Sequence, residues 1–258
     1  MALSAFFTDD NDMQALRAFL LVTSLLVATG SSSAFAADDV PPVVVELFTS
    51  QGCSSCPPAD AYLGDLAKRP DVLALGFHVD YWNYIGWADP FAARFASERQ
   101  RSYAGNLHLQ YVYTPQMVVN GIGEGTGSDR SKIERLISSA AAQHIQHPSI
   151  TLTRGADGQI TVHIGASPSG ESVNAVVWLV SFDRGHSTNV PRGENGGRTL
   201  IDYNAVRSLE RIGAWTGEPL DLSVAENSAM GDGGIAVLLQ QDGTGPILTA
   251  ARIDLPEN

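Results

Sequence analysis

The side chains best suited to chemistry in this 258-residue sequence are those of its two cysteines. Cys53 and Cys56 are separated by Ser54 and Ser55, and the chain has no other cysteine. A disulfide that closes so short a loop adds only about 2 kcal/mol of stability through chain entropy. The C-x-x-C spacing instead suits reversible exchange, in which one thiolate attacks a partner and its neighbour resolves the mixed disulfide.

Metal binding is the competing interpretation of this spacing, because half of a structural zinc site looks the same. A zinc site of this kind needs a second C-x-x-C or two histidines at H-x3–5-H spacing, and the sequence offers neither. His78 and Asp80 could add ligands beside the two thiolates, although a lone histidine on a strand more often has a structural role. We predict no cofactor and no resident metal, and keep binding of a metal through the cysteines as the alternative.

The segments around the cysteine pair predict where it lies in the fold. Residues 43–48 form an apolar, β-branched run, as expected of a strand covered on both faces. After Cys56, apolar side chains recur at helical spacing up to Ala67. We therefore expect the pair at a helix N-terminus, where unpaired amides and the macrodipole favour a thiolate.

Further elements of the first half follow from local signals. A second strand is predicted over residues 72–79, and Asp89-Pro90 has the sequence of a helix start. Thr114-Pro115 leads into a strand that leaves through an Asn120-Gly121 turn. Ser128 or Asp129 can cap the helix that follows.

Five aromatic residues crowd into residues 80–91, and they have two interpretations. They form a wall beside the cysteines that selects an apolar segment of a partner, or they fill the space between a helix and the sheet. Trp82, Trp87 and Gln116 are the candidates for contact with a substrate.

The composition changes near residue 147, where strand patterns replace helical ones. A β-sandwich-like domain is predicted over 148–258, with one possible helix at 203–212, after a first domain over 41–146. The strands are expected at 150–153, 160–164, 176–180, 235–239 and 247–253.

A loop rich in glycine and charge, residues 190–199, interrupts this second half. Arg192, Glu194, Asn195 and Arg198 could form an anion or partner site. The alternative is a structural role, in which the glycines only permit tight turns and the charged residues pair across the interface between the domains.

Three phrases of the sequence, at residues 46–60, 78–82 and 113–121, resemble an exported thioredoxin-like family catalogued as domain of unknown function 1223. The resemblance runs from about Pro42 to near the C-terminus. It implies a thioredoxin-like fold for the first domain, so that with the strand patterns of the second half we expect an α/β thioredoxin-like domain followed by a mostly-β, sandwich-like domain. The family's name assigns no substrate, and a fold alone does not supply one.

The resemblance also implies roles for individual residues. Cys53 would be the exposed attacking thiolate and Cys56 the buried resolving thiol. Pro115 would be a cis-proline facing them, with Thr114 offering backbone groups to a bound peptide. Glu46 would match the buried carboxylate that helps move the resolving cysteine's proton, or it is a strand-end glutamate paired with an arginine.

Residues 1–36 read as a signal peptide, with Met13 as a possible true start. Arg17 precedes a short apolar stretch, and Ala34-Phe35-Ala36 provides a cleavage site. We expect a periplasmic or secreted protein without stable membrane insertion after cleavage. The net charge of −12 disfavours nucleic-acid binding.

These observations predict an exported thiol-disulfide oxidoreductase-like protein that acts on protein or small-molecule thiols and disulfides. The alternative is a non-catalytic binding module on a thioredoxin scaffold. Reactivity of Cys53 as a thiolate would separate the two.

Overall fold

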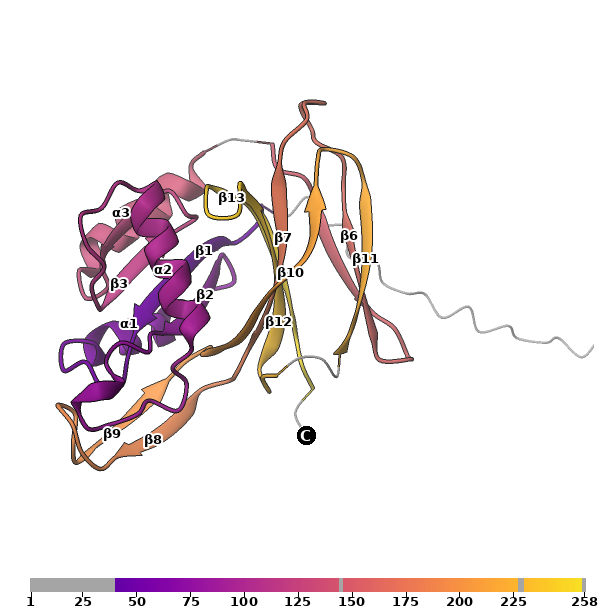
Figure 1. Cartoon of the computed structure of the whole chain (residues 1–258). Helices are drawn as coiled ribbons and strands as arrows, with labels where there is room; N and C mark the ends of the chain where they lie inside the picture. The colour runs from indigo at the N-terminus through magenta and orange to yellow at the C-terminus, as the bar shows by residue number, and fades with distance from the viewer. Residues whose placement is uncertain (1–39, 144–145, 227–229, 257–258) are drawn as a thin grey trace, which may run out of the picture. The chain divides into compact units, whose positions relative to one another are not determined.

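The computed structural model describes residues 40–143, 146–226 and 230–256 (Figure 1). The predicted signal peptide and the possible start at Met13 lie outside these residues. In the part of the chain that is described, no helix combines the length and the apolar character needed to cross a membrane.

A mixed four-stranded sheet with three α-helices forms the first half of the described chain. Its strand order is β2-β1-β3-β4, with β1 parallel to β2 and antiparallel to β3. The elements are β1 (Val43–Thr49), α1 (Pro57–Leu66), β2 (Val72–His78), η1 (Asn83–Ile85), α2 (Arg94–Asn106), β3 (Gln116–Val119), β4 (Gly123–Thr126) and α3 (Arg130–Ala141).

Strand β1 is buried along its whole length, as its unbroken apolar sequence predicts. Val45 and Leu47 lie in a core with apolar residues of α1 and α3. Val44 and Phe48 point to the opposite face, since successive side chains of a strand alternate. The cysteine loop therefore follows a strand that is fixed from both sides.

Antiparallel sheets form the second half. Their strand orders are β10-β7-β12-β13, β11-β6-β5 and β8-β9. The strands are β5 (Ile150–Arg154), β6 (Gln159–Ile164), β7 (Ala175–Phe182), β8 (His186–Val190), β9 (Arg198–Asp202), β10 (Val206–Trp215), β11 (Leu220–Ala225), β12 (Gly234–Gln241) and β13 (Ile247–Asp254). The predicted fold class, α/β followed by mostly β, is confirmed.

One apolar core joins the two halves. Phe77 of the first sheet lies in the same buried cluster as Phe182 and Leu238 of the second half. A separate core fills the second half itself, with Val162 and Val177 among its members. The second half thus packs on the face of the first sheet that carries Val44.

Two predicted helix positions are wrong. Residues 203–212 fall largely in strand β10, whose pairing with β7 shifts register twice and so breaks the alternating pattern of a strand. Helix α2 begins at Arg94 rather than at Asp89-Pro90. The Asp89 carboxylate instead accepts hydrogen bonds from the backbone N–H of Gln51 and of Phe91.

Candidate functional site

The two cysteines form a disulfide between the end of β1 and the start of α1, with their Cα atoms 5.4 Å apart. Cys56 is the N-cap of α1, and its backbone already has helical angles. The pair therefore lies at the helix N-terminus, where the sequence predicts it. There the positive end of the helix dipole favours negative charge on sulfur.

The backbone amides at this helix end are not available, in contrast to our expectation. Pro57 and Pro58 occupy the first helical positions and have no N–H. The amides of Ala59 and Asp60 both donate to the carbonyl of Cys56, over 2.8 and 3.1 Å. The helix dipole, rather than direct N–H donation from these residues, remains to stabilise a thiolate.

Both sulfur-bearing residues are buried. Cys53 is 1% exposed and Cys56 is 0% exposed, whereas Ser54 and Ser55 between them are exposed. The expectation that Cys53 is exposed is therefore wrong for the disulfide state. The reason is long-range packing on the cysteine loop, which no local sequence pattern reveals.

The loop between β8 and β9 forms hydrogen bonds with the backbone of the cysteine loop. The side-chain amide of Asn195 donates to the carbonyls of Gln51 and Cys53, each over 2.9 Å. The backbone N–H of Ser54 donates to a carboxylate oxygen of Glu194 over 3.1 Å. Arg198 in turn donates to the side-chain carbonyl of Asn195. These contacts join the glycine-rich loop of the second half to the cysteine loop of the first.

Two tryptophans of the aromatic run also reach the cysteine loop. The indole N–H of Trp87 donates to the side-chain carbonyl of Gln51 over 2.9 Å. Trp82 lies against Gly52, where an added Cβ would stand 3.1 Å from the Trp82 Cβ, and its indole N–H donates to the Thr114 hydroxyl over 2.8 Å. Both side chains are only partly buried, so each fills space and still presents a surface beside the loop.

The Thr114–Pro115 peptide bond is cis. Pro115 lies close to the first turn of α1, with Gly127 as a common neighbour. A Cβ atom added to Gly127 would stand 2.9 Å from the Cβ of Ala59 and 3.3 Å from the Cβ of Pro115. Gln116 is buried and bonded to the side chains of Gln100 and Glu124. Its side chain therefore does not face an approaching substrate.

A cluster of buried ionisable side chains lies beneath the cysteine loop. Asp60 accepts a hydrogen bond from the Thr49 hydroxyl over 2.6 Å. The His78 imidazole bonds to Asp89 over 2.8 Å and lies 3.7 Å from a carboxylate oxygen of Asp202. This cluster draws on β1, α1, β2, the segment before α2, and β9.

Hydrogen bonds from Gln51 tie this cluster to the cysteine loop. Its backbone N–H donates to Asp89 over 2.8 Å, and its side-chain amide donates to Asp202 over 2.7 Å. Because Gln51 stands two residues before Cys53, these bonds fix the start of the cysteine loop on the cluster.

Burial and mutual interaction shift the pKa values of the cluster. Burial raises the pKa of Asp60 to about 7, with its hydrogen bond from Thr49 acting in the opposite direction. Burial lowers the pKa of His78, but the neighbouring charge and hydrogen bond of Asp89 raise it to about 9. Burial also raises the pKa of Asp202. At neutral pH the cluster thus holds a charged imidazolium and an acid near its midpoint.

Glu46 is buried on β1 and forms an ion pair with Arg99 of α2. One guanidinium nitrogen lies 2.6 Å from its carboxylate, and the Tyr103 hydroxyl donates to the other carboxylate oxygen. Of the two interpretations of Glu46, the structure agrees with the one in which the glutamate pairs with an arginine. Its side chain belongs to the face of β1 that carries Val44 and Phe48, whereas α1 packs on the other face.

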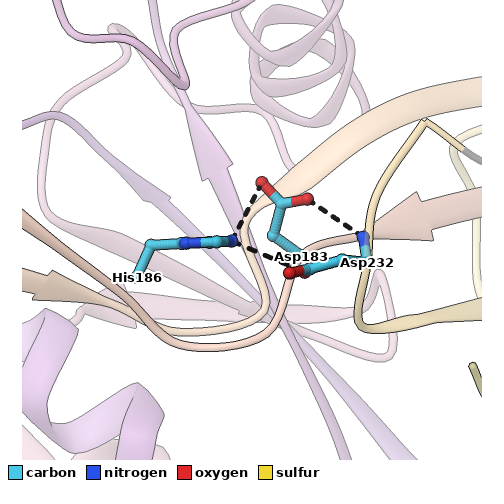
Figure 2. A group of neighbouring side chains, drawn as sticks. All are labelled: Asp183, His186 and Asp232. Atoms are coloured by element: carbon cyan, nitrogen blue, oxygen red, sulfur yellow. Dashed lines mark hydrogen bonds and ion pairs between the residues drawn. The ribbon is translucent and has the colours of Figure 1, made fainter. Parts of the chain in front are cut away.

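Among the described residues, three side chains come close enough together to share a metal ion. Asp183, His186 and Asp232 place their ligand atoms within 4.8 Å of one another, and Figure 2 shows the imidazole directed at both carboxylates. The Arg207 guanidinium lies 3.6 Å from Asp183, and the Arg184 amide donates to Asp232. These donors compete with a cation for the same oxygens.

The candidate metal ligands named from the sequence, His78, Asp80 and the two cysteines, are each bonded to other partners or to each other. The His78 imidazole is bonded to Asp89, and the Asp80 carboxylate accepts a hydrogen bond from Ser97 over 2.5 Å. The two sulfurs are bonded to each other.

Sequence reasoning missed Asp60, Asp89 and Asp202. The signal for Asp60 was present, since it stands four residues after Cys56 and three before Leu63 and therefore lies on the same face of α1 as both. An acid on a buried helix face needs a partner or a proton. Asp202 had no comparable local signal.

The sequence matches the family described as "Protein of unknown function (DUF1223)" over residues 44–240, which confirms the predicted resemblance. Protein AGR_C_4864 from Agrobacterium tumefaciens has 31% identity and a TM-score of 0.74, covering 86% of this chain and 98% of that one. HBP35 of Porphyromonas gingivalis has 12% identity and a TM-score of 0.55, covering 83% and 75%, and shows similarity of fold alone. No curated protein matches the sequence.

Proposed function

Because the chain belongs to the DUF1223 family of proteins of unknown function, we propose its activity from the site itself. The protein is an exported thiol-disulfide oxidoreductase-like protein that exchanges disulfides through Cys53 and Cys56. The observation that carries this proposal is a C-x-x-C disulfide at the N-terminus of α1, one helical turn from a buried acid with a pKa of about 7.

The exchange step follows from the positions of the two sulfurs. A partner thiolate forms a bond with Cys53 Sγ while the bond between the two cysteines breaks, and its electron pair leaves on Cys56 Sγ. The product is a mixed disulfide on Cys53 and a thiolate at Cys56. The helix dipole stabilises that thiolate at the N-cap of α1.

Asp60 is the group proposed to move the proton of Cys56. Cys56 is fully buried, so water has no direct access to its sulfur. Asp60 follows it at the i,i+4 position, and its pKa of about 7 lets it both donate and accept a proton near neutral pH. In the forward step the Asp60 acid protonates the leaving thiolate, and in the reverse step its carboxylate removes that proton.

A place outside the cytoplasm fits this chemistry. The predicted signal peptide would direct export, and disulfides persist in oxidising compartments such as the periplasm. Protein or small-molecule thiols and disulfides are the proposed partners. The two partly buried tryptophans beside the cysteine loop are the surface that a partner would meet.

One observation favours a second function, a non-catalytic binding module. The exposures of 1% and 0% at the two cysteines are those of an inert structural disulfide. In that case the second half carries the function, and the cysteines only fix the loop on which Asn195 and Trp87 pack.

Trapping of partners tests the proposed function against this alternative. Cys56→Ser leaves Cys53 able to attack a partner disulfide but removes the resolving thiol, so mixed disulfides should accumulate in cells that export the protein. Cys53→Ser is the matched control and should trap far less. Equal, negligible trapping by both variants would favour the binding module.

A further inference from the structure

The β8–β9 hairpin stands apart from the other sheets of the molecule. Its two strands pair only with each other among the described strands, from His186 opposite Asp202 to Val190 opposite Arg198. An isolated two-stranded hairpin is marginally stable in water. The contacts that it makes with the first half must therefore hold it in place.

Those contacts are at the base of the hairpin, along its length and at its tip. At its base, Asp202 accepts a hydrogen bond from the side chain of Gln51. Along its length, Val190 and Leu200 are buried, and β9 contacts α1 beside it (Figure 1). At its tip, the loop after β8 carries Glu194 and Asn195 to the cysteines.

The tip binds the backbone on both sides of the redox-active sulfur. Asn195 is fully buried and donates to the carbonyls of Gln51 and Cys53, while Glu194 accepts from the amide of Ser54. Gly193, with φ of +83°, lets the tip approach the Trp87 side chain. Two carbonyls and one amide of the cysteine loop thus form hydrogen bonds with the hairpin.

We propose that the β8–β9 hairpin is a movable cover of the cysteine pair and that Asn195 is the positioning residue that fastens it. This inference rests on the proposed exchange at Cys53. A thiolate must contact the sulfur that it attacks, and Cys53 is 1% exposed with the cover in place. Exchange therefore proceeds through an open form in which the tip has left the cysteine loop, and the reaction rate follows the population of that form.

The rate at which dithiothreitol reduces the Cys53–Cys56 disulfide tests this cover. Reduction of the full chain is followed by quenching, alkylation and mass measurement, below the unfolding transition of every variant. Asn195→Ala removes the two hydrogen bonds that fasten the tip to the cysteine loop and should raise the rate constant about tenfold, by raising the population of the open form. Glu194→Ala, at an exposed position, removes one bond and should raise it by about threefold.

Asn189→Ala is the matched control in the same hairpin. Asn189 is exposed, and its side chain bonds to Thr199 within the hairpin rather than to the cysteine loop. This variant should react at the wild-type rate. If Asn195→Ala does not fold, the reduction rate of Glu194→Ala compared with that of Asn189→Ala tests the cover.

The outcomes separate the cover from the proposed function. Faster reduction of the tip variants alone supports the cover. Equal rates for all forms, with the disulfide readily reduced, overturn the cover and leave the proposed exchange intact. A disulfide that is reduced only at the rate of global unfolding, in the tip variants as well, overturns both.

Discussion

The side-chain amide of Asn195 lies 2.9 Å from the backbone carbonyl oxygen of Cys53, although 142 residues separate the two in the sequence. This bond connects a loop of the β-rich half to the first cysteine of the C-x-x-C pair. Asn195 also bonds to the carbonyl of Gln51, whose amides are bonded to the buried acids Asp89 and Asp202. The cysteine loop, the tip of the β8–β9 hairpin and the ionisable cluster are therefore linked through one residue, Gln51.

The stability of the folded chain should fall as the pH rises through the range in which this cluster titrates. Asp60 has an ordinary pKa of 3.8 and a folded pKa of about 7, so the folded state binds its proton more tightly between these values. His78 has an ordinary pKa of 6.5 and a folded pKa of about 9, so the folded state also binds the His78 proton more tightly between these values. Each group contributes a slope that approaches ~1.4 kcal/mol per pH unit within its window.

Asp60→Asn should remove the part of this slope between about pH 4 and pH 7 and leave the part above pH 7. Asparagine can still accept the hydrogen bond from Thr49. Urea unfolding at a series of pH values measures the effect. A slope in Asp60→Asn that equals the wild-type slope from pH 4 to 7 would contradict the raised pKa of Asp60.

Resolution of a mixed disulfide on Cys53 should also depend on Asp60. Without a base to remove the proton of Cys56, the attack of that thiol slows, and Asp60→Asn should lower the rate about 100-fold near neutral pH. The measurement is the release of a small thiol from a mixed disulfide preformed at Cys53. Asp65→Asn, at an exposed position of the same helix, should leave the rate unchanged. A rate in Asp60→Asn within a factor of two of wild type would exclude Asp60 from proton transfer.

Glu46 should matter for stability rather than for exchange. Glu46→Gln leaves the buried Arg99 charge without its partner, and loss of one member of such a pair costs about 3–5 kcal/mol. Glu98→Gln breaks the exposed pair with Arg94 and should cost less than about 1 kcal/mol. Chemical unfolding measures both. A folded Glu46→Gln protein whose dithiol exchange is as slow as that of Asp60→Asn would restore a catalytic role to Glu46.

Export should remove residues 1–36. Expression of the full sequence in a Gram-negative host should give a periplasmic protein whose N-terminus is Ala37, with the two cysteines oxidised. N-terminal sequencing and a thiol count of the periplasmic fraction measure this. A chain that starts at Met13 should give the same mature protein. An uncleaved chain that stays in the cytoplasm would contradict the proposed location.

The first half of the fold could be predicted from sequence because its signals are local. The apolar run of β1, the helical spacing after Cys56 and the Asn120-Gly121 turn each specify an element within a few residues. Both turn residues have positive φ, as the turn requires. Strand β10 was mistaken for a helix because its two register shifts disrupt the alternation that identifies a strand.

The site was only partly predictable because its buried contacts join distant segments. The cysteine pair, Pro115 and Asn195 stand out in the sequence by their type and their neighbours. The pairing of His78 with Asp89 and Asp202 depends on the packing of β2, the segment before α2, and β9. Cys53 is buried as well, in a loop held by Asn195 from a distant part of the sequence, and local sequence signals suggested an exposed thiol instead.

The pKa of the Cys53 thiol in the reduced protein is the measurement that tests the central claim most directly. The rate of iodoacetamide alkylation as a function of pH, with Cys56→Ser to isolate the one thiol, gives this value. The account predicts a pKa below about 7.5, because the sulfur lies at the positive end of α1, against about 8.5 for an ordinary thiol. A value of 8.5 or higher would mean that this cysteine is no ready nucleophile and would contradict the account.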